Sequence, residues 1–519
     1  MKLIYDVKDR PKFSRLIVLA LQQLLAIMAA TLVVPVIIGN GMSPAAALFG
    51  AGVGTFVYLL FTKFRSPVFL GSSFAFLGSM AAAFAGAATV ALGYLGLIIG
   101  TVFAGLVYVI IAVIVKFVGV NWINKLMPAV VIGPTVAIIG LSLAGNAIGD
   151  LNKTNVTTVL NEHDYQIVEV VKAQTDENGG YLNASVVEYI AVDTDVDVTM
   201  PIPENKIHRE ITVVKNEDGS FTLTANYGST YVALICGLIT LLVTVTVSTY
   251  AKKFAKLIPF VCGIGAGYAA ASVFCIVGVM TNNPALMIID YTPITNLFAN
   301  GITLNSFFAV PEFTFMTALG GFKSLDATYA ATIAVAYVPV AFVVFAEHIA
   351  DHKNISSIIE RDLLSDPGLH RTLLGDGVGS MAGAIFGGCP NTTYGESVAC
   401  VAITGNASVV TILTAALGAI LISFLSPFVA LVNSIPSCVM GGVCMALYGF
   451  IAVSGLKMTQ KVDLEENKNL FVVSAILISG VGGLSVSFGK VSLTTIACAL
   501  ILGIVINIIL SKKKDEAEL

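Results

Sequence analysis

The sequence predicts an all-α polytopic membrane protein, with fourteen transmembrane segments arranged as two inverted seven-span repeats. Three observations predict this class. Of 519 residues, 56% are hydrophobic and 12% are charged, against about 25% charged in a soluble domain. The mean hydropathy is +0.88, and apolar runs of span length recur along the whole chain. Finally, short proline-led segments interrupt these runs at matching places in the two halves, which is typical of transporters built from broken helices.

Composition also excludes several classes. A net charge of −4 does not favour a nucleic-acid partner, and the eight cysteines lie in or beside apolar runs. They form neither a disulfide framework nor a CxxC zinc pattern. The basic start, Met1 to Arg15, runs into an apolar stretch without a small-residue cleavage site, so no removable signal peptide is expected.

In order along the chain, the hydropathy pattern predicts spans near 14–38, 44–62, 67–86, 90–115, 127–147, 230–250, 257–280, 330–350, 370–388, 390–404, 408–426, 438–456, 469–486 and 492–511. Spans 1–5 thus fall in residues 1–147 and spans 6–7 in 229–280. An extracytoplasmic connection of 281–329 follows, and then spans 8–14 in 330–519. Because each half holds an odd number of spans, the second half must be inverted in the membrane.

The placement of basic residues agrees with this count. Lys12 and Arg15 precede the first span, Lys63 and Arg65 follow the second, and lysines 512–514 close the chain. Because cytoplasmic loops are enriched in Lys and Arg, both termini are expected on the cytoplasmic side of the cytoplasmic membrane.

Residues 148–228 are polar and predict a small β-rich extracytoplasmic insertion. Residues 165–171 and 210–214 alternate as short strands do, and 217–220 reads as a hairpin turn. His163 and His208 have no CxxC or HExxH pattern around them, so solvated side chains are favoured over a metal site.

The two interrupted spans are the third and the tenth. The stretch 389–397 holds a proline, two threonines, a glycine and Glu396, and 67–76 is also led by a proline and broken by small residues. Irregular backbone at membrane depth is tolerated only inside protein or beside a water-filled cavity, and a carboxylate there marks a substrate or proton pathway. The alternative is a re-entrant turn at the membrane surface with Glu396 in water. A second matching pair, 128–133 and 436–441, places a proline and a glycine five residues apart at the start of long apolar runs.

Two further carboxylates interrupt the end of the eighth span. Glu347 and Asp351 are four residues apart and therefore share one helix face. Facing the bundle, they could hold a proton or bind a polar ligand. The alternative is a charged helix end at the cytoplasmic surface, which suits His352 and Lys353 better than Glu347, because apolar residues 343–345 come directly before Glu347.

These motifs together resemble one family. The strings NTTYGE (391–396), GSSFAF (71–76) and AEH (346–348), with the loop 361–371, resemble bacterial uracil permeases of the nucleobase–ascorbate transporter family, which are nucleobase:cation symporters driven by protons. The resemblance covers nearly the whole chain apart from 148–228.

The resemblance implies a core domain of spans 1–4 and 8–11, a gate domain of spans 5–7 and 12–14, and a homodimer. It also implies short antiparallel strands in spans 3 and 10 that pair at mid-membrane. Phe74 would stack on a base, while Glu347 and Glu396 would bind its amide edge. The implied substrate-binding residues are Phe74, Glu347, Tyr394, Gly395, Glu396, Ala30 and Ser73, and the implied proton-coupling residues are Glu347, Asp351 and Glu396.

The expected function is therefore proton-coupled import of a neutral nucleobase, uracil first, with the proton as coupling ion and no other cofactor. Uracil is a flat ring with N–H donors and C=O acceptors, which suits carboxylates, backbone N–H groups and an aromatic face. Burial disfavours a charged carboxylate, so such a group can exchange a proton near neutral pH. The alternatives are a xanthine or purine transporter of the same family, an anion transporter on the same fold, and a membrane-embedded sensor or enzyme. Two carboxylates facing the ligand argue against an anion, and no nucleophile–base pair supports an enzyme.

The chain departs from the family pattern at four positions. Asp351 stands where the best-known bacterial uracil permeases have a histidine, although other members carry an aspartate. Ser397 and Ala399 replace an asparagine and a glycine, and Gln23 replaces a histidine common in span one. The first change bears on the proton route, and Ser397 and Ala399 bear on the choice between pyrimidine and purine.

Overall fold

The computed structural model of the protein describes residues 3–119, 128–154, 228–252, 255–299, 301–460, 462–488 and 491–517, with single positions 196 and 206 and the insertion segments 157–160, 165–175, 181–194, 211–215 and 221–226. The predicted turn at 217–220, His163 and His208 lie outside the described residues.

Helices make up most of the first half. They are α1 (Phe13–Ile38), α2 (Pro44–Phe61), α3 (Leu77–Ala85), α4 (Val90–Val118), α6 (Ala129–Ser142), α7 (Ala144–Leu151), α8 (Thr230–Tyr250) and α9 (Pro259–Thr281), with 3₁₀ turns at Phe74–Phe76, Ala255–Leu257 and Pro284–Leu286. Side chains at the N-cap positions help to determine where two of these helices begin. The hydroxyls of Ser43 and Thr89 accept backbone N–H groups at the starts of α2 and α4, as N-cap residues do.

The second half continues in the same way. Its helices are α10 (Thr292–Asn296), α11 (Thr314–Ala318), α12 (Ala327–Ile359), α13 (Leu369–Gly387), α14 (Gly395–Thr404), α15 (Val409–Ile422), α16 (Ser426–Asn433), α17 (Ser437–Thr459), α18 (Asn467–Val481) and α19 (Thr495–Ala517), with 3₁₀ turns at Leu304–Ser306 and Leu319–Ser324 and a π turn at Leu364–Gly368. The predicted proline–glycine pair has a structural meaning, because Pro128 and Pro436 are the N-cap residues of α6 and α17.

In the part of the chain that the structure describes, eight helices are long and apolar enough to cross a membrane: α1, α2, α4, α6 with α7, α8, α9, α12 and α17. Shorter apolar helices occur at Phe74–Ala85, Gly395–Thr404, Val409–Ile422, Asn467–Val481 and Thr495–Ser511. The protein is therefore a multi-pass membrane protein. The helices of spans 3 and 10 are short because an extended segment forms part of each predicted span.

One predicted boundary is wrong. Span 5 is confirmed as the candidate span Ala129–Leu151, whose helix is interrupted at Leu143 between α6 and α7. Span 8 does not end near residue 350. Its helix, α12, continues to Ile359, since polar side chains beyond Glu347 find partners inside the protein. Helix α16, which follows α15 after a turn, was not predicted.

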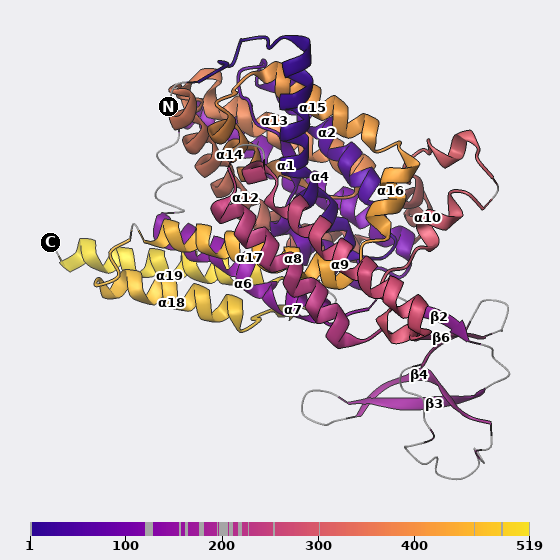
Figure 1. Ribbon diagram of the computed structural model, residues 1–519. Helices are drawn as coiled ribbons and strands as arrows, with labels where there is room; N and C mark the ends of the chain where they lie inside the picture. The colour runs from indigo at the N-terminus through magenta and orange to yellow at the C-terminus, as the bar shows by residue number, and fades with distance from the viewer. Residues whose placement is uncertain are drawn as a thin grey trace.

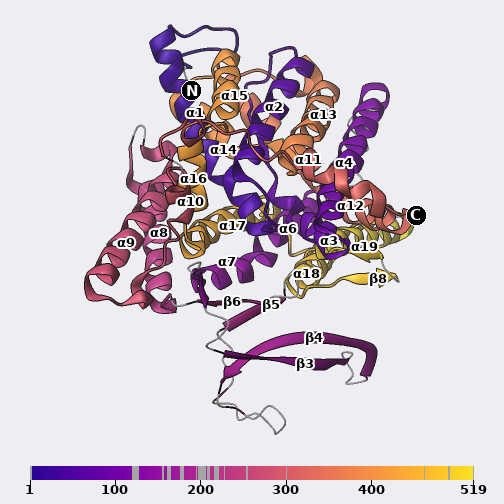
Figure 2. The same cartoon turned by 90° about the vertical axis from the view of Figure 1, so that its right-hand side faces the viewer.

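The strands fall into separate small sheets. β1 (Leu70–Ser72) pairs with β7 (Asn391–Thr393), and β8 (Val486–Phe488) with β9 (Val491–Leu493). In the insertion, β2 (Thr157–Leu160), β6 (Phe221–Asn226) and β5 (Ile211–Lys215) form one sheet, while β3 (Tyr165–Thr175) pairs with β4 (Tyr181–Asp193). The predicted β-rich character of the insertion is confirmed, and its strands project from the helical body (Figures 1 and 2).

The helices pack into two neighbouring groups. Helix α13 packs against α2 and α4, and α15 packs against α1 and α2, whereas α17 packs against α6, α7 and α8. Figure 1 shows α1, α2, α13 and α15 in the upper part and α6, α7, α17, α18 and α19 in the lower part. Glycine allows the closest contacts: a Cβ at Gly50 of α2 would overlap the backbone of Gly383 in α13. Small residues at helix crossings are typical of packing in membranes.

Candidate functional site

The candidate site is built around the two broken segments. β1 and β7 pair antiparallel, with Leu70 opposite Thr393, Gly71 opposite Thr392 and Ser72 opposite Asn391, which confirms the predicted strands of spans 3 and 10. The pairing continues past both ends, since Ser73 N donates to Pro390 O at 2.8 Å and Tyr394 N to Phe69 O at 3.2 Å. A helical segment follows each strand, so two helix N-termini meet here, where N–H groups without helical partners can serve a ligand.

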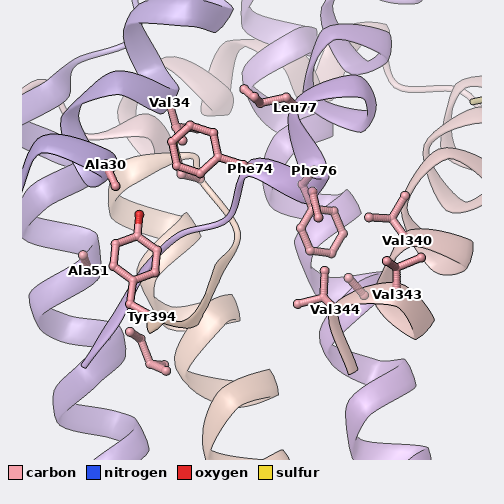
Figure 3. Close-up of a cluster of buried hydrophobic side chains, with 14 of the residues drawn as sticks. Ala30, Val34, Ala51, Phe74, Phe76, Leu77, Val340, Val343, Val344 and Tyr394 are labelled. Atoms are coloured by element: carbon pink, nitrogen blue, oxygen red, sulfur yellow. The ribbon is translucent and has the colours of Figure 1, made fainter. Parts of the chain in front are cut away.

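Gly71 and Tyr394 make a close contact between the two strand segments. The Tyr394 hydroxyl donates to Ser72 O at 2.7 Å, so the ring lies across β1. A Cβ at position 71 would overlap that ring, and only glycine fits beneath it. In Figure 3 the Tyr394 ring lies beside Ala30 and Ala51, with Phe74 near Val34.

A cavity of about 70 Å³ opens beside these strands. This exceeds the ~10–15 Å³ that one water molecule needs. Its polar side is formed by Glu347, Glu396, Ser73 and the segment 392–395, and its apolar wall by Phe74, Ala75, Val136, Ile139, Leu447, Phe450 and Ile451. The wall residues of α6 and α17 come from the second helix group, so the cavity lies where the two groups meet.

Both predicted glutamates line this cavity. Glu396 lies in the first turn of α14, where the helix dipole favours a negative charge. Glu347 reaches the cavity from α12 and is partly buried. Ser73 also lines the cavity, although its hydroxyl oxygen is buried and has no hydrogen-bond partner within the described protein. Carboxylates and an aromatic ring together can bind a small planar molecule with several donors and acceptors.

Asp351 does not line the cavity but lies next to residues that do. The Thr393 hydroxyl donates to Asp351 Oδ2 at 2.8 Å, and Asp351 is not among the residues that line the cavity. Since Asp351 follows Glu347 by one helical turn, about 5.4 Å, it is placed to support Glu347 or Thr393 rather than to touch a ligand. Ala30 is 1% exposed on α1 and also lies outside the lining, beside Tyr394 (Figure 3).

A buried polar network lies further inside and was not predicted as part of the site. His348 Nδ1 lies 2.7 Å from Asp376 Oδ2, and His348 Nε2 lies 3.0 Å from the Thr372 hydroxyl. Because that hydroxyl donates to Leu369 O, it accepts from Nε2–H. The His348–Asp376 pair must then share one proton between Nδ1 and the carboxyl group. The available sequence signal was Asp376 itself, a carboxylate inside an apolar span.

His352 corrects the interpretation of the end of span 8. The sequence favoured a place for it at a charged helix end on the surface, but its side chain is fully buried. Its Nδ1 bonds to His348 O at 2.8 Å and its Nε2 to the Tyr58 hydroxyl at 2.7 Å, and Tyr58 bonds to Ser66 at 2.6 Å. His352 therefore ties α12 to α2, and only Lys353 faces outward as expected.

Two of the four departures from the family pattern are partners. Gln23 Nε2 donates to Ser397 Oγ, which also accepts the Phe69 backbone N–H at 3.0 Å. The pair joins α1, α14 and the segment before β1, directly after Glu396. The Gln23–Ser397 hydrogen bond thus connects α1 to the first turn of α14.

A multi-pass helical protein with a polar cavity between two paired broken helices belongs to the class of membrane transporters. The comparisons agree. The model of the permease family matches residues 14–171 and 222–489. The chain is 33% identical over 523 residues to the uracil permease of Bacillus subtilis (strain 168), covering 99% of this chain and 97% of the relative. It is 32% identical over 505 residues to the uracil permease of Escherichia coli (strain K12), covering 97% and 93%.

The protein therefore belongs to the permease family, and the resemblance to bacterial uracil permeases of the nucleobase–ascorbate transporter family is confirmed. It is a transporter rather than an enzyme. Among solved structures, the transmembrane domain of the cyanobacterial bicarbonate transporter BicA is similar, with a TM-score of 0.54 and 14% identity over 97% of this chain and 100% of that one. The inward-facing murine anion transporter Slc26a9 has a TM-score of 0.59 and 11% identity over 98% and 69%. These structures share the fold alone.

Proposed function

We propose that the protein imports uracil together with protons across the cytoplasmic membrane by alternating access. One observation carries the choice of substrate: the cavity is lined by two carboxylate residues, Glu347 and Glu396, and by Phe74, and no Lys or Arg lines it. Carboxylates accept the N–H groups of a neutral base, and N–H groups at the starts of the helical segments after β1 and β7 serve its carbonyls. The uracil permeases among the relatives support the same substrate.

Proton coupling is assigned to Glu347, Glu396 and Asp351. Glu347 and Glu396 would bind the base, and Asp351 would relay a proton to Glu347 from one helical turn away. The coupling proton and the base would bind at the same carboxylates, so the loaded and the empty site would differ in charge. A symporter needs such a difference between states to link the movement of the base to the movement of the proton.

Alternating access would move one helix group against the other. The cavity draws its polar side from β1, β7, α12 and α14 and its apolar wall largely from α6 and α17. This supports a core domain of spans 1–4 and 8–11 and a gate domain of spans 5–7 and 12–14. The antiparallel pairing of β1 and β7 at corresponding places supports two inverted repeats. We extend the proposal to fourteen spans, cytoplasmic termini, a homodimer and an extracytoplasmic insertion.

Uptake of radiolabelled uracil into proteoliposomes tests the proposal. Uracil should accumulate with an inward proton gradient and only equilibrate without one. Excess unlabelled xanthine tests a purine substrate, and excess sulfate or bicarbonate tests an anion. Competition by sulfate or bicarbonate in the absence of competition by any nucleobase would assign the protein to anion transport instead.

A further inference from the structure

A second hollow lies where the amino-terminal segment meets α1. This groove, of about 470 Å³, is lined by residues that include Ile4, Tyr5, Arg15, Val18, Thr404 and Asn406. None of its lining residues lines the substrate cavity. It is therefore a separate feature, formed by three parts of the chain: the segment before α1, the first turns of α1 and the end of α14.

Backbone hydrogen bonds hold the amino-terminal segment, which forms one wall of the groove. The amino-terminal segment lies along the break between α14 and α15: Ile4 N donates to Gly405 O at 2.7 Å, Ala407 N to Tyr5 O at 2.9 Å and Val409 N to Val7 O at 3.2 Å. The Arg361 guanidinium also pairs with the Asp6 carboxylate. These bonds fix the segment to the turn between α14 and α15 and to Arg361, and the Arg15–Tyr5 bond joins it to α1, so the groove is part of the fold.

The inner end of the groove favours an anion. Arg15 is exposed, and its Nη1 donates to the Tyr5 hydroxyl at 3.4 Å, so the guanidinium is directed toward the groove wall. The first turn of α1 has no acidic residue, and its N-cap Lys12 makes no side-chain cap bond. The N–H groups of this turn add to the positive potential. Of the acids in the amino-terminal segment, Asp6 is paired with Arg361, and the Asp9 carboxylate accepts the Asp6 backbone N–H.

The outer part of the groove is apolar. Ile4 is 67% exposed and Val18 is 55% exposed, and the partly exposed Leu19 also lines the groove. Leu21, 46% exposed, lies on α1 beyond the groove lining. Val18 and Leu21 are three residues apart and share one face of α1, so an apolar strip leads away from Arg15 along a membrane-spanning helix. Free phosphate would gain nothing from this strip, whereas a hydrocarbon chain would.

We propose that this groove binds an anionic phospholipid, with its phosphate at Arg15 and the first turn of α1 and an acyl chain along Val18 and Leu21. Basic pockets at helix ends recognise anionic headgroups in this way. The lipid would also touch Thr404 at the end of α14. The lipid would therefore stabilise the carboxyl-terminal end of α14, the helix whose amino-terminal turn carries Glu396.

The test uses the full-length purified protein in mixed micelles. Native mass spectrometry measures bound lipid, and thermal unfolding measures stabilisation, as dioleoyl phosphatidylglycerol is titrated against dioleoyl phosphatidylcholine. Glycerol 3-phosphate separates the headgroup from the chains. We expect saturable binding and a higher melting temperature with phosphatidylglycerol alone.

Two variants that lose one positive charge each distinguish a site from general attraction. Arg15→Gln should weaken phosphatidylglycerol binding about fivefold or more, whereas Lys12→Gln, outside the lining, should weaken it much less. Equal losses in the two variants would overturn the proposal, as would equal binding of phosphatidylcholine or binding of glycerol 3-phosphate as tight as that of the lipid. Elution of each variant in size-exclusion chromatography checks its fold, and none of these readouts depends on uracil transport.

Discussion

Removing either cavity glutamate should remove most uracil binding. Glu347 and Glu396 line one small cavity from two different helices, α12 and α14. If each accepts one N–H group of the base, truncation to alanine leaves a buried ligand donor unpaired. An unpaired buried donor costs about 1–3 kcal/mol, which is about a 5- to 150-fold loss of affinity.

The substitution to glutamine refines this prediction. Gln keeps one oxygen acceptor but neither carries the negative charge nor exchanges a proton. Glu347→Gln should therefore lose less affinity than Glu347→Ala while losing proton-driven accumulation as completely. Isothermal titration calorimetry in detergent measures the affinity, and uptake into proteoliposomes measures the accumulation.

Glu465→Ala serves as the matched control, since that carboxylate is exposed in the loop before α18 and should leave both measurements unchanged. Uracil affinity at the wild-type level in both Glu347→Ala and Glu396→Ala would refute the assignment of the site. Accumulation driven by a proton gradient in Glu347→Gln would refute the role of that residue in coupling.

Three further outcomes are expected. Asp351→Ala should still bind uracil by calorimetry while losing proton-driven accumulation and keeping downhill exchange, because Asp351 bonds to Thr393 rather than lining the cavity; full accumulation would exclude the relay. Gly71→Ala should lower the melting temperature and uracil affinity together, since the new methyl group overlaps the Tyr394 ring, whereas Gly78→Ala, which meets no atom within 4 Å, should do neither. Replacing 152–226 with a short Gly/Ser linker should preserve uptake per inserted molecule, and lost uptake with normal insertion would give the insertion a role in transport.

The sequence determined the class and the two broken segments, but not the apolar wall that α6 and α17 contribute to the cavity. Apolar runs with few charges have no stable place in water, and interrupted runs at membrane depth must be enclosed by protein. For that reason residues 67–76 and 389–397 could be singled out before their pairing was visible. The family resemblance then indicated Phe74, Glu347 and Glu396, and the structure brings these three side chains to one cavity.

Only the tertiary structure decided which polar side chains pair behind the cavity. The Asp376 carboxyl of α13 meets His348 of α12, and His352 meets Tyr58 of α2, so a histidine expected at the surface is buried. Gln23 and Ser397 are 374 positions apart in sequence, and no local pattern links them. Hydropathy reports how a residue partitions between water and the membrane, whereas hydrogen-bond partners depend on which helices cross and where. That information exists only once the helices have packed.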